Sequence, residues 1–321
     1  MPAPIQIAFA CDDGYARHVA VVMRSIFTHA HPDDRHEFHV LTMGLTTETE
    51  SRLYEVANDG GASLEIHHVD RSRLEGFPEK SHTLNTYLRI LLPELLPVTP
   101  RILYLDADLL VFSSLAELWQ LDLSGAIMAA ATDASYLFGG ISLAHFQRLG
   151  LHPSNRYFSA GVLLMNLNKW SEGDATSLIR SWASEYSQLM THSDQDALNV
   201  ILAGQVMPLH LRWNLQVPLI EPVKYGWNCT REMAEAVAQP GIVHYTGSAK
   251  PWHREYPAPY QNLYFHYLAE TPWKGQLPPP MTIAQRLRRT GRLAKACYMW
   301  ARSEARRWLG RHPAPTEEII R

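Results

Sequence analysis

Short apolar runs alternate with amphipathic segments over the first third of the chain, and this alternation limits the possible folds more than any other feature. In residues 19–30, for example, Val19, Val22 and Ile26 recur at helical spacing. We expect strands at residues 5–10, 37–41, 63–68 and 101–105, and helices at residues 19–30, 47–59 and 84–92. Thr47 and Glu50 have the spacing of a capping box for the second helix. The alternation predicts a mostly parallel, Rossmann-like α/β sheet whose apolar strands are covered on both faces.

The remainder of the chain is less regular. We expect buried strands at residues 161–166 and 241–245, and helices at residues 177–189 and 194–202. Pro278, Pro279 and Pro280 form a stiff break before a basic tail. This pattern predicts one globular domain over residues 1–276 and a separate segment over residues 281–321.

Composition and charge narrow the class of protein. Hydrophobic residues make up 46% of the chain and charged residues 19%, as in ordinary globular proteins. Cys11, Cys229 and Cys297 are widely spaced, so neither a disulfide framework nor a zinc ribbon is indicated, and a reducing compartment is expected. The N-terminal apolar run reads as a first strand rather than a signal peptide, and no run reaches transmembrane length. We therefore expect a cytoplasmic protein.

Asp106 and Asp108 end the strand expected at residues 101–105. Alternate residues of an extended chain point to the same side, so the two carboxylates can share one divalent cation. The carboxyl end of a strand is where α/β sheets bind ligands, and hard oxygen ligands suit Mn²⁺ or Mg²⁺. The alternative is a solvated acidic loop, since Asp194 and Asp196 form a second pair of the same spacing.

Four further segments carry chemistry, each with a purely structural alternative. Asp12 and Tyr15, after the first strand, suit either a nucleobase site or an N-capped helix. Gly247 and Lys250, after the strand that ends near His244, suit a phosphate-binding loop, with His244 as a third metal ligand or a structural residue. Residues 157–161 and 192–196 suit either a sugar pocket or tight packing and a helix N-cap.

In their order and identity, these segments resemble family 8 glycosyltransferases, and most closely the bacterial lipopolysaccharide α-galactosyltransferases of that family. The matching stretches are residues 9–15, 104–108, 157–167, 194–199 and 244–253, which together span most of the chain. The resemblance implies a GT-A type fold with a metal site at the Asp-x-Asp motif. It also implies a retaining hexosyltransferase that takes galactose, or next glucose, from a UDP-sugar to a lipopolysaccharide or related glycan acceptor.

The resemblance also implies roles for individual residues. Asp106, Asp108 and His244 would hold Mn²⁺ (or Mg²⁺) against the diphosphate, and Asp194, Gln195 and Asp133 would lie at the reacting sugar. The donor would contact Ala10, Asp12, Tyr15, Arg89, Ser159, Ala160, Gly161, Gly247 and Lys250. Gly14 and Ser159 each stand where close relatives have asparagine. The change at Gly14 weakens one nucleoside contact, and the change at Ser159 leaves the identity of the donor hexose undecided.

The expected mechanism follows from the chemistry at the anomeric carbon. Double displacement needs a carboxylate nucleophile, but the family position on the required face matches Gln195, whose amide is a poor nucleophile. A front-face mechanism is therefore favoured, with Asp194 as the alternative nucleophile. A non-catalytic nucleotide-sugar-binding protein is the second hypothesis. No recognised nucleic-acid motif appears, and the body is acidic, so no nucleic-acid partner is expected.

The tail differs in charge from the body. Residues 1–280 carry a net charge of −10 and residues 281–321 a net charge of +7. In residues 281–311 nine basic residues accompany apolar residues at helical spacing: Ile283, Leu287, Ala294, Tyr298, Ala301, Ala305 and Trp308. This pattern predicts an interfacial helix that docks the enzyme on the anionic inner face of the membrane, near a lipid-linked acceptor. The alternatives are a helix packed on the acidic body, or two short helices divided at Gly291.

Overall fold

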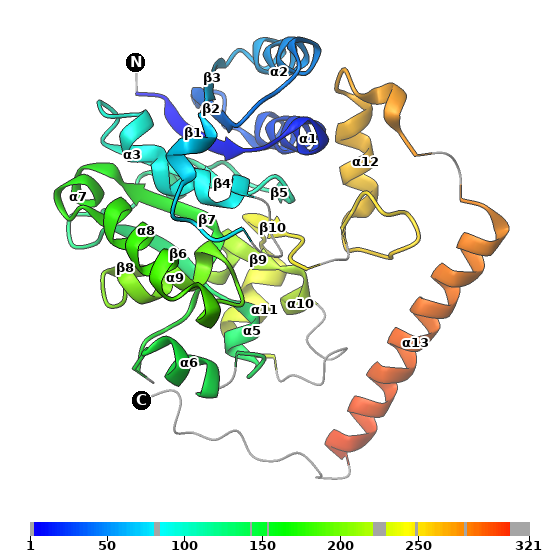
Figure 1. Cartoon of the computed structure of the whole chain (residues 1–321). Helices are drawn as coiled ribbons and strands as arrows, with labels where there is room; N and C mark the ends of the chain where they lie inside the picture. The colour runs from blue at the N-terminus through cyan, green and yellow to red at the C-terminus, as the bar shows by residue number, and fades with distance from the viewer. Residues whose placement is uncertain are drawn as a thin grey trace.

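A seven-stranded sheet with the order β3-β2-β1-β4-β7-β6-β8 forms the centre of the molecule (Figure 1). The computed structural model describes residues 3–79, 84–141, 143–152, 154–220, 229–247, 250–278 and 281–308. The strands of this sheet are β1 (Ile5–Ala10), β2 (His36–Thr42), β3 (Ser63–His68), β4 (Arg101–Leu105), β6 (Met128–Thr132), β7 (Phe158–Asn166) and β8 (Val206–Leu209). The first four were predicted from the sequence, whereas β6 and β8 were not.

The prediction of a mostly parallel sheet is correct for β3, β2, β1 and β4, which pair in parallel. The exception within this mostly parallel sheet is β7, which is antiparallel to both β4 and β6. Because β7 runs the other way, its first residues lie at the sheet edge where β1 and β4 end. Leu105 is paired with Val162, and the backbone N–H of Asp106 donates to the carbonyl of Gly161 over 2.9 Å. This reversal brings the segment before β7 to the carboxylates after β4.

Two helices, α1 (Asp13–His29) and α2 (Thr47–Asp59), cover one face of the sheet (Figure 1). Helix α1 begins six residues earlier than predicted, because the Asp12 side chain caps its first turn. The predicted capping box at Thr47 is wrong by one residue. Thr46 is the N-cap, and its hydroxyl accepts from the backbone N–H of Thr49.

A row of short helices covers the opposite face. They are the 3₁₀ helix η2 (Leu84–Leu91), α3 (Leu92–Leu95), α7 (Leu167–Glu172), α8 (Ala175–Glu185) and α9 (Asp194–Ile201). The helix predicted at residues 84–92 is thus mostly 3₁₀, and the helix predicted at residues 177–189 ends at Glu185 and is followed by η3 (Ser187–Leu189). The two faces bury separate apolar clusters on either side of the sheet.

A second sheet packs beside the first and has the order β5-β10-β9. Its strands are β5 (Leu109–Val111), β9 (Leu215–Gln216) and β10 (Ile242–His244), of which only β10 was predicted. The remaining elements are η1 (Arg71–Leu74), α4 (Ala116–Trp119), α5 (Ala134–Leu137), α6 (Leu143–Leu149), η4 (Leu211–Asn214), α10 (Val217–Ile220), α11 (Arg231–Ala238), α12 (Gln261–Ala269) and η6 (Lys274–Gln276). Since β5 follows directly after Asp108, this sheet brings His244 to the end of β4.

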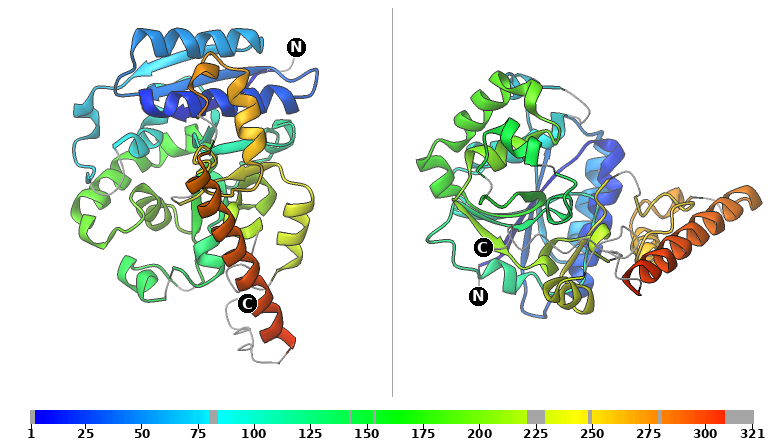
Figure 2. Two further views of the ribbon diagram at one scale, coloured as in Figure 1. Left: turned by 90° about the vertical axis from the view of Figure 1, so that its right-hand side faces the viewer. Right: turned by 90° about the horizontal axis from the view of Figure 1, so that it is seen from below.

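The long helix α13 (Ile283–Trp308) lies beside the body rather than within it (Figures 1 and 2). It continues through Gly291 as one helix, so the predicted basic segment is helical and undivided over these residues. Pro279, Pro280 and residues 309–321, which include Arg311, lie outside the described residues. Within the described part of the chain, no helix has both the length and the apolar character to cross a membrane.

Candidate active site

A cavity of about 860 Å³ opens where β1, β4 and β10 end and β7 begins. All fifteen residues that the sequence analysis assigned to the site line this cavity: Ala10, Asp12, Tyr15, Arg89, Asp106, Asp108, Asp133, Ser159, Ala160, Gly161, Asp194, Gln195, His244, Gly247 and Lys250. They come from segments far apart in the sequence, so the fold brings the five predicted motifs together at one sheet edge. Ser248 and Ala249, between Gly247 and Lys250, lie outside the described residues.

Asp106, Asp108 and His244 converge on one point of this cavity. One ligand atom from each lies within 4.8 Å of the other two. His244 Nε2 is 3.3 Å from Asp108 Oδ1 and 3.8 Å from Asp106 Oδ2. Two carboxylate oxygens and an imidazole nitrogen form a donor set that suits Mn²⁺ or Mg²⁺, so the arrangement fits the predicted metal site. Asp106, Asp108 and His244 are called the metal group below.

Neighbouring residues orient these three side chains. His244 Nδ1 lies 2.8 Å from Asn214 Oδ1, an acceptor, so Nδ1 carries the proton and Nε2 is free to face the carboxylates. Asp106 Oδ1 accepts from the Tyr104 hydroxyl over 3.1 Å and from Arg89 over 3.0 Å, which leaves Oδ2 turned toward His244. Hydrogen bonds within the protein thus orient the ligand atoms of His244 and Asp106.

Lys250 lies against the same group. Its ammonium donates to the Asp108 carboxylate and, over 2.7 Å, to the Tyr245 carbonyl. Burial opposes ionisation of Asp108, but His244 and Lys250 together hold the pKa of this carboxyl below its ordinary value. Gly247 has φ +79° and no atom within 4 Å of the position of a Cβ, which suits a loop whose backbone approaches a ligand.

Gly161 lies directly against the metal group. A Cβ at this position would be 2.2 Å from His244 Cε1 and 2.9 Å from Asp106 Oδ2, closer than non-bonded atoms come. A side chain would push His244 or Asp106 out of place. Glycine is therefore required by the approach of β7 to the metal group, and the sugar contact implied for Gly161 stays a prediction.

Arg89 joins the metal group to α9 below the floor of the cavity. It is only 4% exposed, and its guanidinium reaches Asp106, the Ala160 carbonyl and Asp194, with Nε 3.2 Å from Asp194 Oδ2. Its carbon Cζ lies over the Tyr104 ring at 4.4 Å. Burial raises the pKa of Asp194 to about 6, against the opposing charge of Arg89. The guanidinium is thus engaged by protein groups, which makes it an organising cation for the two carboxylates.

Gln195 is held at both ends of its amide. Its Oε1 accepts from the Ala160 backbone N–H over 3.0 Å, and its Nε2 donates to Asp133 Oδ2 over 3.2 Å. The other oxygen of Asp133 caps α5 through the Ser135 N–H. Ser193, just before α9, has φ +47° but makes no side-chain cap to the helix. This strained backbone presents Asp194 and Gln195 to the cavity.

At the far end of the cavity, Asp12 and Tyr15 occupy the first turn of α1. The Asp12 carboxylate caps the helix, and its second oxygen is 3.4 Å from the Asn85 amide nitrogen. Tyr15 is 44% exposed and meets Trp252 edge-on. Asp12 therefore has the structural role expected of it, that of the N-cap of α1. The exposed Tyr15 ring offers a face on which a base can stack.

Several polar residues of the cavity were not found from the sequence: Asn85, Thr86 and Gln216, together with Asn214 behind His244. Asn85 and Thr86 lie in η2, Asn214 is the last residue of η4 and Gln216 is the last residue of β9, and no sequence motif marks any of them. The 3₁₀ geometry of η2 was not predicted from the sequence either.

Comparison with known proteins agrees with this geometry. The family model for glycosyl transferase family 8 matches residues 6–256, and the chain belongs to this family. The crystal structure of the galactosyltransferase LgtC, in complex with donor and acceptor sugar analogues, superposes with a TM-score of 0.75 at 30% identity and covers 85% of this chain and 100% of LgtC. This match confirms the predicted GT-A type α/β fold.

Two curated relatives are similar over most of their length. General stress protein A of Bacillus subtilis is 30% identical over 277 residues, which are 84% of this chain and 94% of the relative. The lipopolysaccharide 1,2-glucosyltransferase of Escherichia coli is 25% identical over 283 residues, which are 85% of this chain and 80% of the relative. The predicted resemblance to family 8 is therefore confirmed.

Proposed function

We propose that this glycosyltransferase moves a hexose from a UDP-sugar to a lipopolysaccharide or related glycan acceptor, with retention at the anomeric carbon and with Mn²⁺ or Mg²⁺ bound by Asp106, Asp108 and His244. The observation that carries the proposal is the convergence of these three ligand atoms within one cavity, which Tyr15 and Lys250 also line. Bound there, the cation supplies charge neutralisation for the departing diphosphate.

Other residues that line the cavity bind the remaining parts of the donor. Tyr15 and Asp12 bind the uracil, since the Tyr15 ring is open for stacking and the Asp12 carboxylate accepts from a base N–H. Lys250 and the backbone at Gly247 hold phosphate oxygens, and Lys250 must turn from Asp108 toward the diphosphate as the donor binds. Ala10, Ser159, Ala160 and Gly161 line the cavity on the sugar side. Position in the cavity and side-chain chemistry together support each of these proposed roles.

Retention by a front-face route is favoured by how Gln195 and Asp194 are held. The Gln195 amide is fixed by Ala160 and Asp133, and an amide is a poor nucleophile. Asp194 is buried and paired with Arg89, so its attack on the sugar would expose and unpair a buried arginine. We therefore infer that Asp194 and Gln195 position the donor sugar, and that Asp133 holds the Gln195 amide in place.

The donor hexose is proposed as galactose, with glucose next. LgtC is a galactosyltransferase and the Escherichia coli relative a glucosyltransferase, so the comparisons allow both sugars. The two hexoses differ in the orientation of one hydroxyl, which a single hydrogen-bonding side chain can distinguish. Ser159 lines the cavity where close relatives have asparagine, and its short side chain loosens this choice.

The catalytic unit is proposed as residues 1–276, and the segment 281–321 as its attachment to the anionic inner face of the membrane. In α13 the apolar residues Ile283 and Leu287 are 78% and 68% exposed, and Tyr298 is 65% exposed. Contact with the body is made by Arg289 and Arg292, which donate to the Arg254 and Glu255 carbonyls. This favours an interfacial helix over one packed by its apolar face on the body.

The experiment that tests the proposed function is an assay of nucleoside-diphosphate release over a panel of sugar donors, with a lipopolysaccharide core acceptor. We expect release from UDP-galactose or UDP-glucose, little from GDP- or ADP-sugars, and an α-anomeric product by NMR. Tight UDP-sugar binding without turnover on any acceptor would support the second hypothesis, a non-catalytic nucleotide-sugar-binding protein. An inverted product anomer would contradict retention.

A further inference from the structure

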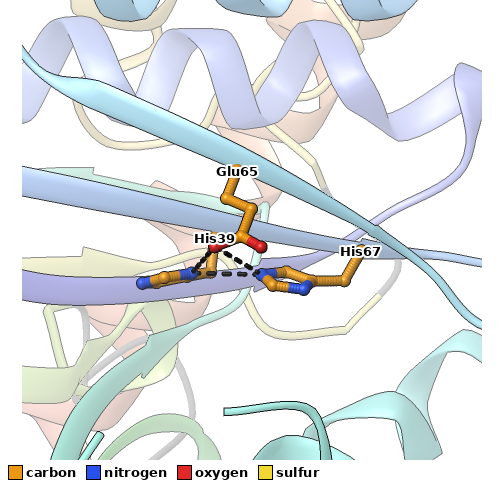
Figure 3. A group of neighbouring side chains, drawn as sticks. All are labelled: His39, Glu65 and His67. Carbon is orange, nitrogen blue, oxygen red and sulfur yellow. Dashed lines mark hydrogen bonds and ion pairs between the residues drawn. The ribbon is translucent and has the colours of Figure 1, made fainter. Parts of the chain in front are cut away.

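A second cluster of metal-binding side chains lies at the free edge of the seven-stranded sheet, on β2 and β3 (Figure 3). It consists of His39, Glu65 and His67. His39 is paired with Glu65 across the two parallel strands, and His67 follows Glu65 by two residues, so all three side chains point to one face. None of these residues lines the cavity described above.

The spacing of the three ligand atoms matches a shared cation. His39 Nδ1 and His67 Nε2 are 3.1 Å apart, and Glu65 Oε2 is 3.8 Å from the first and 3.7 Å from the second (Figure 3). In a tetrahedral site with bonds of about 2.0–2.1 Å, ligand atoms are separated by about 3.3 Å. The carboxylate is too far from either ring for a hydrogen bond, yet at a distance from which it can share a cation with them.

Gln6, on the neighbouring strand β1, fixes the orientation of the His39 ring. Gln6 Oε1 lies 2.6 Å from His39 Nε2, and Gln6 Nε2 donates to Glu37 Oε2 over 2.6 Å. Because the amide oxygen only accepts, Nε2 of His39 carries the proton and its Nδ1 lone pair points at His67. A histidine ligand held by a hydrogen bond from its second nitrogen is the usual arrangement at metal sites.

The surroundings of the cluster suit binding from solvent. His39 is buried, whereas Glu65 is 62% exposed at the rim and gives access to the two rings. Burial lowers the pKa of both imidazoles, which keeps them neutral and able to bind a metal at physiological pH. Two imidazoles and one carboxylate, with a position left for water, form a ligand set that suits Zn²⁺.

We propose that His39, Glu65 and His67 bind a Zn²⁺ ion that joins the edge strand β3 to β2, at a site separate from the catalytic metal group. Two states are then open to the cluster. Without the ion, His67 Nε2 donates directly to His39 Nδ1; with it, both nitrogens and the Glu65 carboxylate turn to the cation. Because the ligands come from two strands, the bound ion stabilises their pairing and raises the stability of the folded chain.

The test measures zinc bound per chain by equilibrium dialysis and mass spectrometry, on the full-length protein and two variants. His67→Gln removes a ligand. His68→Gln is the matched control, since the neighbouring His68 points to the other face of the sheet and pairs with Glu50. We expect His67→Gln to lose one zinc ion per chain and His68→Gln to lose none. Zinc bound at the catalytic group, or at the His145, His192 and Asp196 group, is equal in both variants.

Two further variants refine the result. Gln6→Ala keeps every ligand but frees the His39 ring, so zinc affinity should fall by about 10–100-fold. Glu65→Gln changes an exposed side chain and serves if His67→Gln fails to fold; it should also weaken zinc binding. Equal zinc content and affinity in His67→Gln, or in Glu65→Gln if that variant replaces it, and His68→Gln would overturn the proposal and leave the direct hydrogen bond between the two histidines.

Discussion

The candidate active-site cavity and the helix α13 differ in how the fold holds them in place. In the cavity, Asp106 is held by Tyr104, Arg89 and the backbone of β7, so one carboxylate depends on segments from across the chain. Helix α13 meets the body through a few arginines and leaves its described apolar residues exposed. One substitution in the cavity should therefore abolish most of the turnover. Membrane binding through α13 should instead be shared among many residues, so that one substitution weakens it only slightly.

The largest effect expected from one substitution is on turnover. Asp108→Asn removes a ligand and a charge from the metal group, and the loss of several kcal/mol of transition-state stabilisation lowers kcat by about 10³-fold. The thermal unfolding midpoint should change little. Asp33→Asn, on an exposed loop, is the control and should keep full activity.

Removal of the buried charge of Arg89 should cause the largest loss of stability. Arg89→Met leaves Asp106 and Asp194 without their shared partner, and the free energy of unfolding should fall by about 3–5 kcal/mol in chemical denaturation. Arg71→Met breaks an exposed ion pair with Glu79 and should cost about 0–1 kcal/mol. Equal losses in the two variants would show that Arg89 does not organise the site.

Gly161→Ala tests the contact between β7 and the metal group. The added methyl must displace His244 or Asp106, so kcat/KM should fall by about 10²-fold, in the range of losing one transition-state contact. Gly44→Ala places a methyl where no atom lies within 4 Å and should leave kcat/KM unchanged. If Gly161→Ala kept normal activity, β7 would not set the position of His244.

The comparison predicts a different response in α13. A chain that ends at Pro280 should lose binding to anionic liposomes in flotation while it keeps UDP release with a soluble acceptor. Arg288→Ala should weaken liposome binding by only about 1 kcal/mol, with the effect reduced by salt. Equal flotation of the truncated and full-length proteins would contradict the docking proposal. Loss of fold on truncation would favour the packed-helix alternative.

The smallest effect concerns the choice of hexose. Ser159→Asn introduces the residue that the family resemblance implies at this position, and the ratio of kcat/KM for UDP-galactose over UDP-glucose should shift by about tenfold or less. The measurement is a competition between the two donors. An unchanged ratio would remove Ser159 as a determinant of donor choice.

The sequence predicted the first four strands because apolar runs between helical segments leave few other folds. It also identified the residues of the five motifs, which the structure brings together in one cavity. The direction of β7 was missed, because a period of two residues is the same for a parallel and an antiparallel strand. The antiparallel direction is what places Gly161 beside Asp106.

Other features escaped for equally physical reasons. The short strands β5 and β9 exist through their pairing with β10, and local propensity does not mark them. Thr46 rather than Thr47 caps α2, since two adjacent threonines offer the same hydroxyl to the helix. Asn214 contacts His244, which is distant in the sequence. His39 lies beside Glu65 only because β2 and β3 pair. Spacing along the chain reveals neither contact.

The central claim is that Asp106, Asp108 and His244 hold a cation required for transfer from a UDP-sugar. The most direct measurement is UDP release from UDP-galactose by chelator-dialysed protein, before and after Mn²⁺ is added. The account predicts negligible release without the cation and full release once it is restored, with no recovery in Asp108→Asn. Full activity of the wild-type protein in excess chelator would contradict it.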